Sequence, residues 1–275
     1  MDTPANKLEA CFTPMRKLNE KHPQPVLTFG GLPNLANVTV ILVEPATAGN
    51  VGSAARAMKT MGLTDLVVVN GVEFKNSLQA TMMGHGAGDL LERARTVPTW
   101  EEATAGLHWL IGTTHRKRRA QFPQVLTCRT AAVKIASLSQ KHRVGLVFGR
   151  EESGLSDAEL RQCQEVASVP QASEHPSLNL SQAVMIFAYE IYAASLGEVP
   201  VARQNLATVH EIESLLQHLS TALAKVGFRP HQGDAESFLR SLRRVLGRAP
   251  LEQRDVNVLH RICQQIDYYA SEHEK

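Results

Sequence analysis

Apolar residues follow two different patterns along this chain, and the change falls near residue 200. Short β-branched runs, first VTVILVE at 38–44 and then LVVVN at 66–70, are typical of strands buried on both faces of a parallel sheet. Similar runs are HWLIG at 108–112, VGLVFG at 144–149 and EVASV at 165–169. Helical stretches alternate with these runs, so the pattern predicts a parallel α/β sheet over residues 37–200.

Helical spacing replaces the strand pattern in the last part of the chain. SAARAMKTMG at 53–62, ended by Gly62, and the largely apolar 180–196 predict helices within the α/β region. Beyond Asn205, apolar residues recur every three or four positions in the segments 210–228, 236–248 and 256–270. We therefore expect a helical C-terminal extension over 205–275.

The first 36 residues fit neither pattern. They hold five of the 13 prolines and the pair Gly30-Gly31, which predicts an irregular N-terminal extension before the α/β domain. They also lack the apolar core of a secretory signal. No apolar run in the chain approaches the roughly 20 residues that span a bilayer, so we expect a cytoplasmic protein that does not enter a membrane.

The net charge becomes informative only when it is divided by position. The 29 basic and 27 acidic residues give +2, which excludes a histone-like polycation and an acidic tail protein. Four consecutive residues are basic: Arg116, Lys117, Arg118 and Arg119. They carry a charge of +4, so the net charge of the rest of the chain is −2. Adjacent like charges repel each other, and binding to nucleic-acid phosphates relieves that repulsion. We expect this basic run to bind a nucleic acid, with a solvated basic loop as the alternative.

The cysteines argue against two kinds of site. Cys11, Cys128, Cys163 and Cys263 are far apart and form no CxxC pair, which argues against a zinc site and more strongly against a disulfide framework. We expect no metal and free thiols in a reducing compartment.

Candidate chemistry lies in four segments that follow predicted strands, where open α/β sheets place their binding sites. In the first, at 45–56, Gly49 and Gly52 allow tight turns, Asn50 offers a hydrogen bond and Arg56 lies on the following helix. The segment lacks the dinucleotide and Walker A glycine patterns. A structural turn with a surface arginine explains it equally well.

The second and third segments follow the runs at 108–112 and 144–149. Thr113 and Thr114 can hydrogen-bond a ligand beside the basic run. In VFGREESGLS, Gly149 ends a strand and two carboxylates follow it, while Ser156 has Glu159 at capping-box spacing. Adjacent carboxylates rarely converge on one point, so a structural loop and helix cap is favoured here.

The fourth segment, at 169–184, precedes the long apolar helix. Ser177, Asn179 and Ser181 offer hydroxyl and amide groups, and either Ser177 or Asn179 can serve as the cap of that helix. From the residues alone, the four segments predict a small-molecule site near a basic patch without defining a reaction.

Together, three of these segments resemble a known family. NVGSAARAMKTMG, LVFGREESGLS and SLNLSQAV are similar to the three ordered motifs of SPOUT-class RNA 2′-O-ribose methyltransferases, the TrmH/SpoU superfamily. The tail FLRSLRRVLGRAPLEQRDVNVLHRI resembles the branch that methylates the tRNA anticodon loop. The resemblance runs from about Asn37 to about Gln265 and leaves out the first 36 residues.

This resemblance implies a SPOUT (α/β knot) fold with a C-terminal trefoil knot, a homodimer, and S-adenosyl-L-methionine as cofactor. Its implied cofactor-binding residues are Thr113, Thr114, His115, Gly149, Val169, Pro176, Ser177 and Leu178. Its implied catalytic motif residues are Arg56, Asn50, Glu151, Ser177 and Asn179. RNA contacts are expected from the basic run at 116–119 and from Arg56. His115, the basic stretch and Pro176 depart from the branch's pattern, and the first two lie where they can alter the choice of RNA.

The implied reaction is methyl transfer to a ribose 2′-hydroxyl, with position 32 of the tRNA anticodon loop, a cytidine or uridine, as the favoured target. A guanidinium stays protonated, so our hypothesis is that Arg56 positions a phosphate or the hydroxyl and does not act as a base. The alternatives are a ribosomal RNA 2′-O-methyltransferase of the same class and a non-catalytic RNA-binding protein on this scaffold.

Overall fold

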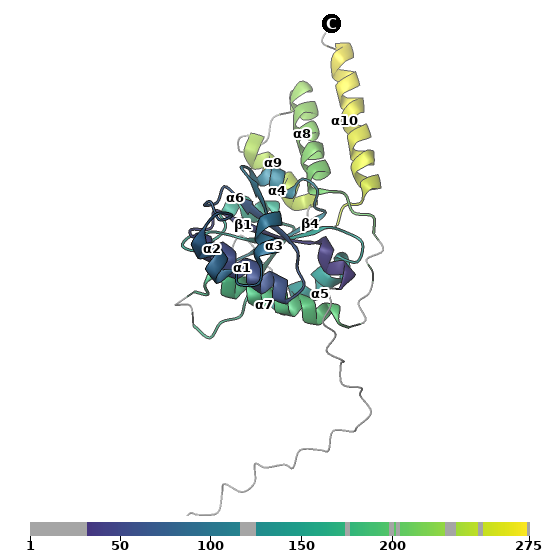
Figure 1. The fold of residues 1–275 in the computed structure, drawn as a ribbon. Helices are drawn as coiled ribbons and strands as arrows, with labels where there is room; N and C mark the ends of the chain where they lie inside the picture. The colour runs from purple at the N-terminus through teal and green to yellow at the C-terminus, as the bar shows by residue number, and fades with distance from the viewer. Residues whose placement is uncertain are drawn as a thin grey trace, which may run out of the picture. The chain divides into compact units, whose positions relative to one another are not determined.

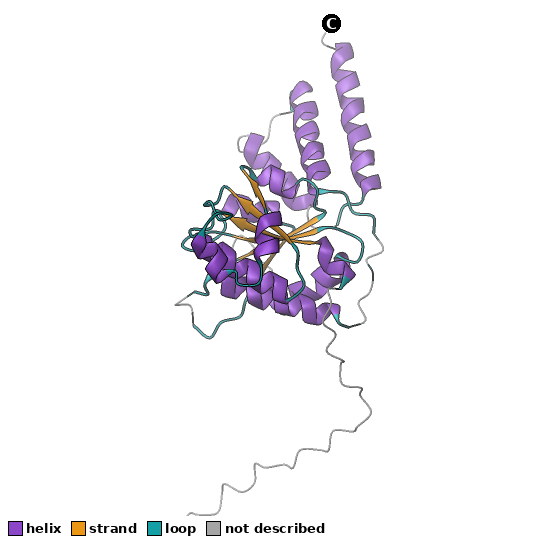
Figure 2. Cartoon of the chain, viewed as in Figure 1, coloured by secondary structure: helices purple, strands orange, loops and turns teal. Residues whose placement is uncertain are grey.

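The computed structural model describes seven parts of the chain: residues 32–115, 125–173, 177–197, 201, 204–228, 235–246 and 250–273. Its centre is a seven-stranded sheet in the order β3-β2-β1-β6-β4-β7-β5, and every hydrogen-bonded pair of strands is parallel (Figure 2). The predicted parallel α/β sheet is confirmed.

All five predicted strands are present, and two further short strands were not predicted. The strands are β1 Val38–Val43, β2 Asp65–Val69, β3 Arg95–Val97, β4 Trp109–Thr113, β5 Val125–Thr127, β6 Val144–Phe148 and β7 Glu165–Ser168. β3 and β5 have three residues each, too few to form an apolar run, and both lie at edges of the sheet, where burial imposes less of a pattern.

The predicted helices are present, with one difference in a boundary that affects the site. The helices are η1 Pro33–Asn37, α1 Ala48–Thr60, α2 Leu78–Met83, α3 Gly88–Arg93, α4 Trp100–Thr104, α5 Cys128–Leu138, α6 Asp157–Gln162, α7 Leu180–Ser195, α8 Val209–Lys225, α9 Ala235–Leu246 and α10 Gln253–His273. α1 begins five residues before the predicted 53–62, because the Thr47 side chain accepts a hydrogen bond from the Asn50 backbone N–H and caps the helix there.

The early start of α1 corrects the role expected of two glycines. Gly49 and Gly52 were predicted to form tight turns, but both are helical and buried. Gly52 instead lets α2 approach, since a Cβ at this position would lie 2.3 Å from the carbonyl oxygen of Ala80. Gly62, expected to end the helix, does lie just beyond it with a φ of +76°.

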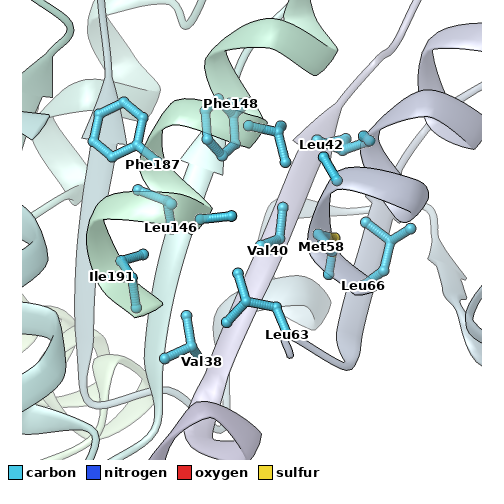
Figure 3. Close-up of a cluster of buried hydrophobic side chains, with 14 of the residues drawn as sticks. Val38, Val40, Leu42, Met58, Leu63, Leu66, Leu146, Phe148, Phe187 and Ile191 are labelled. Atoms are coloured by element: carbon cyan, nitrogen blue, oxygen red, sulfur yellow. The ribbon is translucent and has the colours of Figure 1, made fainter. Parts of the chain in front are cut away.

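Alternate residues of β1 serve the two faces of the sheet. Val38, Val40 and Leu42 point to the face covered by α1, α5 and α7, where Phe187 and Ile191 meet them (Figures 1 and 3). Residues of β1 on the other face join a second cluster to which α4, α6 and the start of α8 contribute Trp100, Leu160 and Val209. A strand buried on both faces requires the continuous apolar run from which β1 was predicted.

The place of β7 in the sheet does not follow the order of the strands along the chain. β7 lies between β4 and β5, although β5 follows β4 directly in sequence. The Thr114 backbone N–H donates to Ala167 O at 2.9 Å, so the segment that leaves β4 begins against β7. The remainder of that connection, 116–124, lies outside the described residues, and the knot itself stays a prediction.

The end of the expected N-terminal extension is more ordered than predicted. Pro33–Asn37 form the 3-10 helix η1, and Asn34 and Leu35 are buried. The Asn34 side-chain amide donates to the hydroxyls of Ser139 and Ser195, at 3.0 Å each, which ties η1 to α5 and α7. Residues before Leu32 lie outside the described residues.

The helical extension has a small core of its own. α8 and α10 bury Leu215, Ala222, Val256 and Cys263 against each other. The Val209 backbone N–H donates to Leu107 O at 2.8 Å where α8 begins. Within the part of the chain that the structure describes, no helix is both long and apolar enough to cross a membrane.

Candidate functional site

An open cavity lies at the carboxyl edge of the sheet. The segments that follow β4, β6 and β7 form its walls, and the first half of α7 closes one side. This is the edge at which open α/β sheets bind ligands. The lining residues are Thr113, Thr114, His115, Phe148, Gly149, Arg150, Glu151, Ser153, Gly154, Val169, Gln171, Ser177, Leu178, Leu180, Ala183 and Phe187.

The structure brings together most of the residues expected to bind the cofactor. Seven of the eight line this cavity: Thr113, Thr114, His115, Gly149, Val169, Ser177 and Leu178. The eighth, Pro176, lies outside the described residues, as does the basic run Arg116, Lys117, Arg118 and Arg119. Their binding roles stay predictions, but the expected residues from three separate segments share one cavity.

The cavity has an apolar wall and a polar rim. Phe148 and Phe187 form part of the wall, and their rings meet edge to face at 5.7 Å between centroids. Glu151, Gln171 and Ser177 supply polar groups. Such a combination suits a ligand with an aromatic ring and a charged polar part.

The turn after β6 is shaped by two glycines. A Cβ on Gly149 would lie 2.2 Å from the backbone of Gly154 and Leu155, so only glycine permits this close approach. Gly154 has a φ of +69°, in the left-handed region that favours glycine. Its backbone N–H donates to Arg150 O at 2.8 Å and closes the turn. The GREESG sequence therefore folds back on itself beside the cavity.

A hydrogen-bond relay connects three of the expected motif residues. Glu151 accepts hydrogen bonds from the Ala46 backbone N–H at 2.9 Å and from the Asn50 side-chain amide at 2.7 Å. Asn50 Oδ1 accepts in turn from Asn179 Nδ2 at 3.1 Å. The relay Glu151–Asn50–Asn179 thus fixes the segments after β1, β6 and β7 relative to one another, and both functional groups of the Asn50 amide are occupied.

Asn179 is the N-cap of α7, a role for which the sequence offered either Ser177 or Asn179. Its Oδ1 accepts from the Ser181 backbone N–H at 2.8 Å, and Gln182 completes a capping box. Ser177 is exposed and lines the cavity. The Ser156–Glu159 capping box predicted for α6 is also present.

Arg56 is an expected catalytic residue that lies outside the cavity lining, as Asn50 and Asn179 also do. It lies six residues after Asn50 on α1, which places it about 9 Å further along the axis and on a different side of the helix. Its side chain is exposed, and no described residue forms an ion pair with it. It is therefore available to a molecule that approaches from outside.

Arg150 is a cavity residue that the sequence did not single out. Its Nε and Nη2 donate to the two carboxylate oxygens of Glu44 at 2.8 Å each, and Nη1 donates to Glu159 at 3.2 Å. Hydrogen bonding from Arg150 is the main reason that the pKa of Glu44 lies below its ordinary value. The partner Glu44 lies 106 residues earlier, a separation that a single sequence cannot bridge.

Two family models cover most of the chain. Residues 37–189 match the SpoU rRNA Methylase family, and residues 210–275 match the tRNA methyltransferase TrmJ C-terminal domain.

Within the described residues, no group of three His, Cys, Asp or Glu side chains is arranged to hold a metal ion.

Two similar proteins from different bacteria carry the same name. The tRNA (cytidine/uridine-2′-O-)-methyltransferase TrmJ of Yersinia pestis (strain Pestoides F) is 38% identical over 242 residues, which cover 85% of this chain and 92% of the relative. The TrmJ of Pectobacterium atrosepticum is 37% identical over 239 residues, covering 84% and 97%.

Solved structures agree with these relatives. TrmJ from Z. mobilis ZM4 superposes with a TM-score of 0.72 at 30% identity and covers 83% of this chain and 98% of that one. A probable methylase family protein from Haemophilus influenzae Rd KW20 gives a TM-score of 0.56 at 31% identity, covering 86% and 98%.

Proposed function

The chain belongs to the SpoU rRNA Methylase family and ends in a TrmJ-type C-terminal domain, and from this premise we propose that it methylates a ribose 2′-hydroxyl of tRNA. The enzyme is a methyltransferase that depends on S-adenosylmethionine. The observation that carries the assignment is the cavity, which gathers seven of the eight residues expected to bind the cofactor.

The residues of the cavity fit S-adenosylmethionine. Phe148 and Phe187 offer apolar surface to an adenine ring, while Glu151 and Ser177 offer polar groups to the amino acid part. When bound, the cofactor supplies an electrophilic methyl group on a sulfonium sulfur.

The chain's own residues position the acceptor. The cavity residues would hold S-adenosylmethionine so that it supplies its methyl group to the ribose 2′-oxygen, which would leave a neutral thioether, and the hydroxyl proton would pass to solvent water. Arg56 stays protonated, so it holds the neighbouring phosphate or the hydroxyl oxygen and lowers the barrier by orientation and electrostatics. Asn50, Glu151 and Asn179 hold the cavity segments in register.

We propose a homodimer as the working assembly. Arg56 is exposed and outside the cavity of its own chain, so the acceptor RNA has to approach over a surface beyond that cavity. α2, which packs against the Arg56 helix α1, exposes two large apolar side chains: Leu78 is 75% exposed and Met82 is 67% exposed. Such apolar surface supports a protein contact at α2. Light scattering on the purified protein measures the mass directly.

We propose that the target is position 32 of the tRNA anticodon loop. The relatives that are named tRNA methyltransferases and the matching C-terminal domain favour tRNA as the substrate. The basic run at 116–119 supplies positive charge for the tRNA phosphates. A cytoplasmic location follows from that substrate. A division into a catalytic domain at 37–200 and a helical extension at 205–275 is supported by the two family matches.

Incubation with labelled S-adenosylmethionine and either tRNA or ribosomal RNA transcripts tests this function. Label in tRNA alone is the expected result. Label only in ribosomal RNA would support the other member of the class, and failure to bind the cofactor in calorimetry would support a non-catalytic RNA-binding protein.

The role of Arg56 is tested by Arg56→Ala, with Arg93→Ala, an exposed arginine on α3, as the matched control. We expect Arg56→Ala to keep its cofactor affinity and to lose about 100-fold in single-turnover rate, since orientation and charge stabilisation contribute at least that much. A wild-type rate in a variant that binds both ligands would contradict the role.

A further inference from the structure

We infer that Arg150 is a positioning residue for methyl transfer, and that it acts through its neighbour Glu151. This inference rests on the proposed function, because it concerns the same cavity. Arg150, Glu44 and Glu159 form one cluster, called the arginine clamp below. The clamp ties together three elements: the end of β1, the turn after β6 and the first turn of α6.

The geometry of the clamp depends on a guanidinium. Two nitrogens of Arg150 bind the two oxygens of Glu44 at 2.8 Å, and Nη1 binds Glu159 Oε1 and Oε2 at 3.2 Å. Glu159 also accepts from the Ser156 backbone N–H at 2.6 Å as the capping box of α6. A planar guanidinium binds one carboxylate through two parallel hydrogen bonds and keeps a further donor for the second, a fixed geometry that a lysine ammonium lacks.

The clamp holds a segment of unusual backbone conformation. Glu44 has a φ of +46°, which residues other than glycine rarely adopt. Its backbone N–H donates to Val69 O at 2.9 Å. Such a conformation persists only when its surroundings hold it, and the hydrogen bonds from Arg150 are one part of that hold.

Arg150 and Glu151 form hydrogen bonds to the same segment, the one that follows β1, at two places. Arg150 binds Glu44, while Glu151 binds the backbone N–H of Ala46, two residues later, and the side chain of Asn50. Without the hydrogen bonds between Arg150 and Glu44, the end of β1 can move relative to the turn after β6. The hydrogen bonds that Glu151 accepts, and with them the relay Glu151–Asn50–Asn179, then lose their fixed geometry.

The two carboxylates also explain why a guanidinium is acceptable in this cavity. The Arg150 side chain is 28% exposed and faces Glu159 at 16% and Glu44 at 40%. The cluster as a whole carries one negative charge, so it does not repel a cationic cofactor. An unpaired arginine in the same lining would repel it.

The experiment compares full-length Arg150→Gln and Arg150→Lys with the wild type. We expect both variants to lower the single-turnover rate by about 100-fold, the cost of a displacement of about 1 Å in a reacting geometry. Failure of lysine to rescue the rate distinguishes a positioning fork from a simple positive charge. A rate that lysine restores would overturn the inference.

A double-mutant cycle tests whether Arg150 acts through Glu151. In a Glu151→Ala background, Arg150→Gln is expected to cause little further loss, because both hydrogen bonds that Glu151 accepts are already gone. Fully additive losses would show that Arg150 acts independently of Glu151, which contradicts the inference. If Arg150→Gln does not fold, Glu44→Gln removes one arm of the clamp and enters the same cycle.

Hydrogen exchange gives a readout that needs neither cofactor nor RNA. The Ala46 amide is bonded to Glu151, so its exchange is expected to accelerate in Arg150→Gln and stay unchanged in the control Lys134→Gln. Lys134 forms an ion pair with Glu165 at 2.6 Å, at the amino-terminal end of β7. Unchanged Ala46 exchange would overturn the inference, whereas a wild type without methylation would refute the proposed function alone.

Discussion

Some residues of the site could be predicted from the short motif in which they lie, whereas others are identified only by their contacts in the folded structure. Asn50, Glu151 and Asn179 were expected from short motifs, and the structure joins them by hydrogen bonds. Arg150 was missed because its partner Glu44 is distant in sequence. Asn179 also caps α7, so its motif position has a structural role in addition to any catalytic one.

Gly149→Ala tests the tight turn beside the cavity. The new methyl group would lie 2.2 Å from the backbone of Gly154, so the turn must open and cofactor affinity is expected to fall by about 10-fold or more. In the control Gly154→Ala, the methyl group meets nothing within 4 Å, and only the φ of +69° opposes it, at about 1 kcal/mol. Calorimetric titration with S-adenosylmethionine compares them, and equal affinities would contradict this prediction.

Acid sensitivity is a second property set by single residues. The pKa of Glu44 is lowered in the folded protein, chiefly by hydrogen bonding from Arg150. A lowered pKa stabilises the folded state above the ordinary value of 4.5, and this contribution is lost as the pH falls through the folded pKa. Denaturant titrations should therefore show wild type more stable than Glu44→Gln near neutral pH, with the difference shrinking below pH 4.5. A difference that is independent of pH would contradict this origin.

Elements were predictable where an apolar run was long and were missed where it was short. β1 is buried along its whole length, and α7 buries one face with residues three or four positions apart, so both produce clear patterns. β3 and β5 have three residues each, and pairing with a neighbouring strand defines them more than their own composition. The start of α1 was misplaced because its first turns are rich in glycine, which tertiary packing against α2 explains and helix propensity does not.

Gly52→Ala tests that packing between α1 and α2. A Cβ would lie 2.3 Å from Ala80 O, so α2 must move and the free energy of unfolding is expected to fall by about 1–3 kcal/mol. Gly88→Ala is the control, because it lies in the first turn of α3 and a Cβ there meets nothing within 4 Å. Chemical denaturation measures both, and a Gly52→Ala variant as stable as the control would contradict the close approach.

At the scale of the whole molecule, the sequence predicted a parallel α/β sheet followed by helices. It gave no strand order, because the insertion of β7 between β4 and β5 depends on contacts between distant segments. The division of charge was also visible only in sequence, since the basic run at 116–119 lies outside the described residues. That run directly follows His115 in the cavity lining, which is why we place RNA beside the cofactor.

Neutralising Arg116, Lys117, Arg118 and Arg119 together tests where RNA binds. We expect weaker tRNA binding and a slope of log affinity against log salt that is shallower by about 3, the change for four lost phosphate contacts. Cofactor affinity is expected to stay within about twofold, because these side chains bind phosphates and not the cavity ligand. An unchanged salt slope would mean that the run is solvated surface.

The central claim is methyl transfer to one ribose hydroxyl of tRNA. Its most direct test is mass spectrometry of two anticodon-loop substrates after incubation with the enzyme and S-adenosylmethionine, one all-ribose and one with a single 2′-deoxyribose at position 32. We expect one 2′-O-methyl group at position 32 of the first substrate and no methylation of the second. Methylation of both substrates, or a methyl group on a base, would contradict it.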